Sequence, residues 1–192
     1  MLKKVSIISV FAFALCCFIV NPVLAKGPFV DVGTPGKGWV KGPSGQAGKS
    51  NIAHLYLHEK DPTTWEIIED GAWGKMRYNR SGELFDFVFN GHHLETGVTY
   101  ALIYYPDPWP GAGLICLGVG MADEYGDVHI RGKVDTGDMP NENDGNEGAK
   151  IWLVLQDDVD CDFQLMIGWN PGEYLFEFDL ISFEATQDLA EE

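Results

Sequence analysis

The chain has 192 residues, of which 13 are Lys or Arg and 29 are Asp or Glu, so its formal net charge is −16. Hydrophobic residues make up 45% of the chain and charged residues 22%, a balance that supplies a packed core and excludes disorder throughout. The excess of acids argues against nucleic acid or an anionic membrane surface as a partner, because both require clusters of Lys and Arg.

The first 25 residues have the pattern of a signal peptide. Two lysines begin it, an apolar run follows over residues 5–20, and residues 23–25 end it with the small residues that a signal peptidase reads. A retained N-terminal anchor is the alternative, although the run is shorter than the ~20 residues of a comfortable membrane span. We expect residues 1–25 to be removed on export, which leaves a secreted or cell-surface protein with no stable membrane insertion.

Residues 26–50 differ in character from the rest of the chain. They include seven Gly, three Pro, four Lys and one Asp, so their net charge is +3, and this composition predicts an extended, flexible arm. Residues 51–192 have seven basic and 28 acidic side chains, a net charge of −21. Arm and body are therefore electrostatically complementary, and we expect the arm to dock on a neighbouring copy or on a surface partner.

The body is predicted to consist of β-strands, because apolar and polar residues alternate with a period of two and short turn-rich gaps recur. The expected strands are 53–59, 84–90, 98–105, 114–121, 128–135, 151–155 and 174–181, and residues 65–68 also favour a strand. About eight or nine strands in ~130 residues predict an all-β fold, a single antiparallel β-sandwich of the Ig-like or Greek-key type. This domain is expected over residues 51–184, with an acidic tail over 185–192, and a closed β-barrel is the alternative.

Four segments of the body have a sequence pattern in common with a known group of proteins: residues 85–118, 126–140, 149–161 and 169–184. The first includes the pattern N-G-x-x-L-x-x-G-x-x-Y-x-L, which is typical of two strands joined by a turn. In these segments the chain resembles secreted β-sandwich modules of bacterial and archaeal cell-surface proteins. The resemblance covers residues 52–184. It implies a sandwich fold and an extracellular setting, and it implies no catalytic residue.

Two cysteines, Cys116 and Cys161, remain after removal of the leader. An even number of cysteines in an oxidising compartment predicts one disulfide, and two buried free thiols are the alternative. Neither cysteine has the CxxC or Cys/His spacing of a zinc site.

Four acids lie close together in the chain, and three of them alternate with other residues: Asp157, Asp158, Asp160 and Asp162. This spacing resembles the start of an oxygen-ligand loop for Ca²⁺. The loop is not an EF-hand, because Phe163 stands where that motif requires Gly. The interpretation is a solvated acidic turn with no cofactor, and the alternative is a looser Ca²⁺ site that these four residues share with other acidic loops.

Residues 104–111, YYPDPWPG, predict a loop stiffened by proline with Trp109 at its apex. A rigid, exposed aromatic ring loses little entropy on binding and offers a flat face to a sugar ring or to a partner. Trp169 lies in a second turn of this kind, and Tyr105 adjoins the first. These three residues predict a ligand-binding surface, and the alternative is that the rings fold back over the core.

The remaining motifs are short. The five histidines include the residue type of a Zn²⁺ or Cu²⁺ site, but no spacing brings three of them together, so the interpretation is surface histidines. Asn79 begins an N-x-S sequon on a predicted turn, which marks a glycosylation site in a glycosylating cell.

No GxSxG, HExxH or phosphate-binding Gly loop occurs in the sequence, so we expect a non-catalytic protein. Three functions follow, in order of preference. The first is an exported structural or interaction module that associates with itself, a surface protein or a glycan through its basic arm. The second is a carbohydrate-binding module that uses Trp109 with Ca²⁺ in acidic loops. The third is a secreted hydrolase with a pair of carboxylates.

Overall fold

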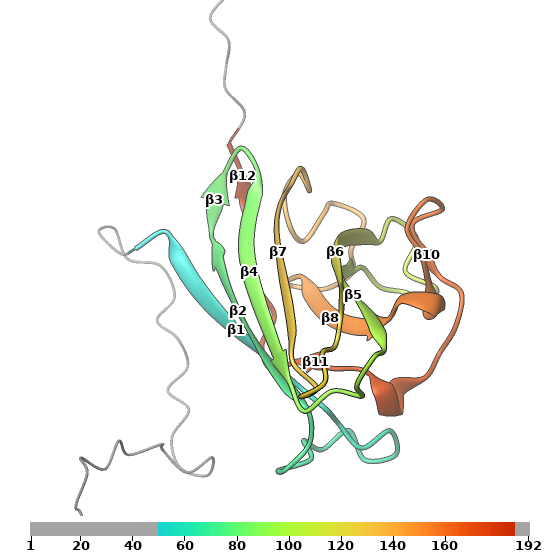
Figure 1. Cartoon of the computed structure of the whole chain (residues 1–192). Helices are drawn as coiled ribbons and strands as arrows, with labels where there is room; N and C mark the ends of the chain where they lie inside the picture. Colours follow the sequence, from blue (N-terminus) through green and yellow to red (C-terminus); the bar gives the residue numbers. More distant parts are fainter. Residues whose placement is uncertain (1–49, 187–192) are drawn as a thin grey trace, which may run out of the picture. The chain divides into compact units, whose positions relative to one another are not determined.

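The computed structural model describes residues 50–186, whose two main β-sheets are antiparallel and pack face to face (Figure 1). Two additional pairs of short strands are present, one antiparallel and one parallel. The predicted signal peptide, residues 26–49 of the predicted arm and residues 187–192 of the predicted tail lie outside the described residues. The larger sheet has the strand order β11-β1-β2-β4-β7, and the smaller has the order β6-β5-β8. No helix among the described residues is long and apolar enough to span a membrane.

The longer strands are β1 (Ile52–His58), β2 (Trp73–Asn79), β4 (Phe85–His92), β5 (Thr99–Tyr105), β6 (Ile115–Met121), β7 (Val128–Val134) and β8 (Lys150–Leu155). The short strands are β3 (Ser81–Gly82), β9 (Val159–Asp160), β10 (Leu165–Met166), β11 (Phe176–Glu177) and β12 (Glu184–Ala185). Two 3₁₀ turns, η1 (Gln156–Asp158) and η2 (Pro171–Glu173), complete the elements. The predicted all-β sandwich is confirmed, and the barrel alternative is wrong for the described residues because β6 and β7 belong to separate sheets.

The core forms where the period-two alternation of the strands points inward. In β4, for example, Phe85, Phe87 and Phe89 are buried while the residues between them face outward. They pack against Leu102 and Tyr104 of β5, which lies in the middle of the smaller sheet. These contacts between sheets make up the main core of the sandwich.

Three strand predictions differ from the structure. Residues 73–79 form β2, which was not predicted because Gly and charged residues obscure its alternation. Residues 65–68 form no strand and contribute only an isolated bridge between Ile67 and Lys60. Residues 174–181 include only the two-residue β11, because this segment changes its pairing partner along its length. Leu175 pairs with Leu153 of β8, and Glu177 pairs with Leu57 of β1. Ile181 then pairs with Ala149, the residue before β8.

Strand β5 is buried on both faces, because a second layer covers the smaller sheet. Ala101, Ile103 and Tyr105 face away from the main core and pack in a second cluster with Leu114, Trp152, Val154, Val159, Met166, Tyr174 and Phe176. A disulfide between Cys116 of β6 and Cys161 attaches the β9–β10 segment to this face, with the two Cα atoms 5.7 Å apart. The predicted disulfide is therefore confirmed, and the free-thiol alternative is wrong.

Two glycines of β6 allow the sheets to approach closely. A Cβ at Gly118 would lie 2.6 Å from Cγ2 of Ile130, and one at Gly120 would lie 2.7 Å from Cγ2 of Val128. Because both contacts are with buried residues of β7, a side chain at either position must displace the opposite sheet.

We expect Gly118→Val to lower the free energy of unfolding by about 1–3 kcal/mol, the usual cost of overpacking a core. Urea unfolding followed by Trp fluorescence measures the effect. Gly145→Val is the matched control, because a Cβ at Gly145 has no heavy atom within 4 Å. Equal urea midpoints for the two variants would contradict this account of β6.

Candidate binding site

The outer face of the smaller sheet has an aromatic floor made by neighbouring strands. Register places Ile103 of β5 opposite Trp152 of β8, and Tyr105 opposite Lys150. The rings of Tyr105 and Trp152 stack with centroids 4.0 Å apart and an interplanar angle of 13°. Both residues are buried, so the floor is rigid.

Two loops add exposed tryptophans above this floor. The Trp169 ring lies 6.1 Å from that of Trp152, and the Trp109 ring lies 5.5 Å from that of Trp169 at 77°. Trp109 is 52% exposed and Trp169 is 42% exposed, so neither ring folds back into the core. The structure thus brings the predicted Tyr105, Trp109 and Trp169 together, around a hollow of about 610 Å³ lined by Tyr105, Asp107, Pro108, Trp109, Trp152 and Trp169.

A buried carboxylate holds the Trp169 loop in place. The Asp158 carboxylate accepts hydrogen bonds from the Tyr174 hydroxyl at 2.5 Å and from Nδ2 of Asn170 at 2.8 and 3.0 Å. The main-chain oxygen of Asp158 accepts bonds from the amides of Ile167 and Gly168. Both neighbours of Trp169 in the chain are therefore bonded to one residue. Burial, followed by the hydrogen bond to Asp158, raises the pKa of Tyr174, so this hydroxyl remains a donor at neutral pH.

Two of the four residues considered as Ca²⁺ ligands in the acidic loop form hydrogen bonds within the protein. The Asp158 carboxylate is directed toward Tyr174 and Asn170, and Oδ1 of Asp160 accepts bonds from the amides of Asp162 and Phe163 at 3.0 and 2.9 Å. Within residues 50–186 no group of three or more His, Cys, Asp or Glu is placed to hold a metal ion. The hypothesis of a Ca²⁺ site at Asp157, Asp158, Asp160 and Asp162 stays untested.

A charged pair borders the hollow. Nζ of Lys150 donates to Oδ2 of Asp107. Burial raises the pKa of Asp107, but hydrogen bonds from Lys150 and Asn146 outweigh this effect and leave the pKa below its ordinary value. Burial and the nearby Asp107 raise the pKa of Tyr105 to about 12. At neutral pH the border thus has an ionised carboxylate and the floor has a neutral phenol.

Trp65 extends the aromatic cluster, and it was not predicted. Its ring is 50% exposed and lies 5.2 Å from that of Phe176 and 6.4 Å from that of Trp169. The backbone of Trp65 has φ = 61°, an outlier for a bulky residue, and its amide bonds to the main-chain oxygen of Asp61 at 2.8 Å. Oδ1 of Asp61 also accepts the amides of Thr63 and Thr64. The Asp-Pro-Thr-Thr turn was the only sequence signal for this loop, and the β-branched residues after it favoured a strand instead.

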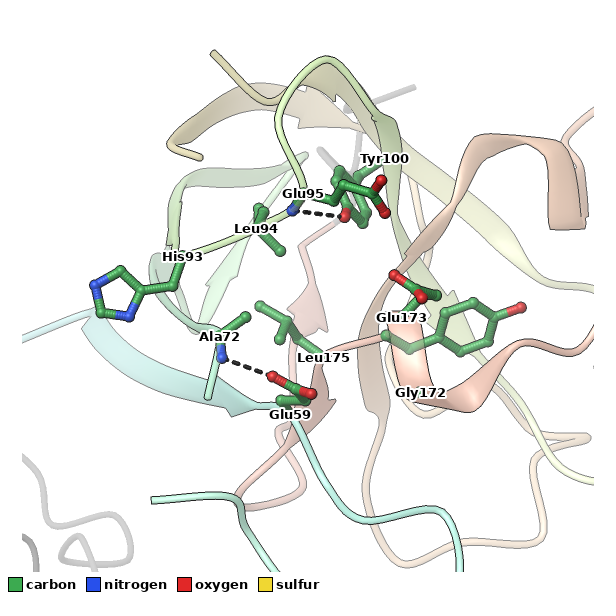
Figure 2. Close-up of a pocket in the computed structure, with 10 residues that line it drawn as sticks. Glu59, Ala72, His93, Leu94, Glu95, Tyr100, Gly172, Glu173 and Leu175 are labelled. Atoms are coloured by element: carbon green, nitrogen blue, oxygen red, sulfur yellow. Dashed lines mark hydrogen bonds between the residues drawn. The ribbon is translucent and has the colours of Figure 1, made fainter. Parts of the chain in front are cut away.

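A separate cavity of about 330 Å³ is lined by Glu59, Glu95 and Glu173, and Figure 2 shows Glu95 beside Tyr100 and Glu59 beside Ala72. Glu59 Oε2 accepts the amide of Ala72 at 2.8 Å, and the Glu95 amide donates to the Tyr100 hydroxyl at 3.3 Å. Burial raises the pKa of Tyr100, and the three glutamates add to this effect. The cavity offers the carboxylates that the hydrolase hypothesis requires, but its two tyrosine rings, Tyr100 and Tyr174, are buried and present no exposed face to a sugar.

The other predicted residues lie elsewhere. Asn79, at the end of β2, donates from Nδ2 to the main-chain oxygens of Ser81 and Leu84, so attachment of a glycan to this nitrogen would have to replace these bonds. The five histidines do not meet, and His92 pairs with Asp127 at 2.8 Å.

Fold and site together define a disulfide-bonded two-sheet sandwich with a cluster of partly exposed tryptophans on its smaller sheet. Comparisons of the chain with protein-family models, with curated proteins and with solved structures found no match.

Proposed function

We propose that this chain is an exported, non-catalytic module that binds a glycan at the hollow lined by Tyr105, Trp109, Trp152 and Trp169. The observation that carries the proposal is the cluster of exposed tryptophan rings beside an ionised Asp107. A sugar ring has an apolar face of C–H groups and an edge of hydroxyls. The apolar face would stack on an indole, and the hydroxyls would bond to the charged border.

The angle between the rings favours a single glycan chain over a flat, crystalline surface. The planes of Trp109 and Trp169 are 77° apart, and those of Trp152 and Trp169 are 53° apart. Rings that share no plane cannot lie together on a flat sheet of parallel sugar chains. They can hold one chain from two sides, and the rigid floor limits the entropy lost on binding.

The extracellular setting has two independent supports. The first is the signal-peptide pattern of residues 1–25. The second is the Cys116–Cys161 disulfide, because such bonds persist in oxidising compartments and are rare in the cytosol. Glycans are abundant ligands outside the cell, which agrees with the proposed activity.

We expect Trp109→Ala and Trp169→Ala each to weaken glycan binding at least tenfold, since each removes one stacking face. A glycan array of soluble chains identifies the ligand, and affinity gel electrophoresis measures the affinity of each variant. Tyr125→Ala is the control, because Tyr125 is also an exposed aromatic residue but lies between β6 and β7. Unchanged affinity in both tryptophan variants, with native urea midpoints, would refute the proposal.

A further inference from the structure

The outer face of the larger sheet presents basic side chains in neighbouring rows that run across the strands. Strand register places His54 of β1 opposite Arg77 of β2, Arg77 opposite Val88 of β4, and Val88 opposite Arg131 of β7. Residues paired in this way lie on the same face, so the row crosses four strands. The adjacent row consists of Tyr56, Lys75, Asn90 and His129.

The charge on this face is opposite to that of the rest of the domain. Residues 50–186 contain seven Lys or Arg and 25 Asp or Glu. Strands β1, β2, β4 and β7 contain only one acid, Asp86, but they contain four of the seven basic residues: Lys75, Arg77, Arg131 and Lys133. We refer to these four residues as the cationic face. The need to keep an exposed sheet soluble does not account for this segregation, because acidic side chains, which are far more abundant in the domain, would make the sheet equally soluble.

The charges of the cationic face are largely uncompensated. Lys133 pairs with Asp86 at 3.0 Å, whereas no ion pair among the described residues involves Lys75, Arg77 or Arg131. Burial, Lys75 and Arg77 together lower the pKa of His54, as expected where cations crowd without a counter-charge. A hollow of about 320 Å³ lies here, lined by His54, Lys75, Arg77, Val88 and Asn90.

We propose that the cationic face binds an anionic polysaccharide, one that has carboxylate, sulfate or phosphate groups along its chain. The guanidinium group forms paired hydrogen bonds with such anions. Arg77 and Arg131 lie on the two strands that flank β4, so their backbones are about 10 Å apart, and an extended chain laid across the strands meets both. This site is distinct from the aromatic hollow and does not depend on it.

A second copy of the chain is the simplest alternative occupant of the cationic face, and charge argues against it. A second copy related by a two-fold axis would place one cationic face against another, and like charges would repel. A copy bound in another orientation would have to offer a concentrated acidic patch, whereas the acids of the domain are spread over many loops. A polysaccharide with repeated anionic groups along its chain supplies the concentrated negative charge that the cationic face requires.

The test uses the mature full-length protein and two pectins that share a backbone. We expect polygalacturonate to bind and highly methyl-esterified pectin, whose carboxylates are blocked, not to bind. Binding of polygalacturonate should weaken as NaCl is raised, because salt screens exposed charges. Arg77→Ala combined with Arg131→Ala should reduce the affinity at least tenfold in affinity gel electrophoresis. Tyr125→Ala, at an exposed position outside both proposed sites, should leave it unchanged.

A charge-matched control distinguishes an effect of the cationic face from an effect of the net charge of the protein. Thr99→Glu combined with Asn143→Asp also makes the protein more negative by two charges, at exposed positions outside the four strands, and should bind as the native protein does. Native affinity of the double-arginine variant, or equal binding of both pectins, would overturn the proposal. Tighter binding of a single-stranded oligonucleotide than of polygalacturonate would also overturn it. A failure to bind polygalacturonate would do the same, and self-association that the double-arginine variant loses in sedimentation would then identify a second copy of the chain as the occupant.

Discussion

Replacing Cys116 and Cys161 by serine is expected to lower the free energy of unfolding by about 4 kcal/mol. The disulfide closes a loop with a sequence separation of 45 residues, and a cross-link of this length removes considerable entropy from the unfolded chain. Its loss also releases the β9–β10 segment from the smaller sheet, where this segment covers the second core. Urea unfolding of the native and double-serine proteins measures the difference.

Reduction of the native protein provides the control for this variant. Dithiothreitol breaks the same bond without a change of side chain, so the reduced protein and the double-serine variant should have similar urea midpoints. A loss far below 4 kcal/mol in both would mean that packing alone holds the β9–β10 segment. We also expect weaker glycan binding, because Trp169 follows this segment in the chain.

Asp158→Ala is expected to cost about 3 kcal/mol of folding stability and to weaken glycan binding. The variant leaves the buried Tyr174 hydroxyl without its acceptor, and an unpaired buried donor is expensive. It also removes the acceptor of the Asn170 side-chain amide, which is at an exposed position. It also opens a cavity beneath the Trp169 loop. Because the loop then has no fixed position, the entropy lost on ligand binding increases. Urea unfolding and affinity gel electrophoresis measure the two effects separately.

Asp162→Ala is the matched control for Asp158→Ala, since it removes the same group from an exposed position in the same acidic stretch. It should change the stability by less than about 0.5 kcal/mol, as surface substitutions usually do. Tyr174→Phe removes only the hydroxyl and should cost about 1 kcal/mol. Full stability of Asp158→Ala would show that the carboxylate does not organise this loop.

The strands that could be predicted are those with one solvent-exposed and one buried face. Residues 53–59, 84–90 and 128–135 alternate clearly, and each corresponds to a strand of the larger sheet. Strand β2 also has one solvent-exposed and one buried face, but Gly74 and its polar neighbours leave only Met76 and Tyr78 as a clear inward pattern. Residues 174–181 alternate well, yet two different sheets take their hydrogen bonds.

The candidate site was predictable only in part, and for a physical reason. Trp109 and Trp169 lie in turns with proline, which is a local signal of an exposed loop. Trp152 lies within the continuous apolar run 151–155, where periodicity does not separate one face from the other. Trp65 joins the cluster through a backbone conformation that the sequence does not indicate. Two of the four tryptophans of the cluster, Trp152 and Trp65, could therefore be placed there only from the tertiary structure.

The all-β class, a disulfide between the two remaining cysteines and the strongly acidic character of the body could be predicted from the sequence, because hydrophobic period, cysteine number and charge are local or additive properties. Which side chains come into contact depends on the tertiary structure. Tyr105, Trp152 and Trp169 are brought together by strand register and by loops that cross the smaller sheet. The same holds for Arg77 and Arg131, which are far apart in the chain and share a row because β2 and β7 both pair with β4.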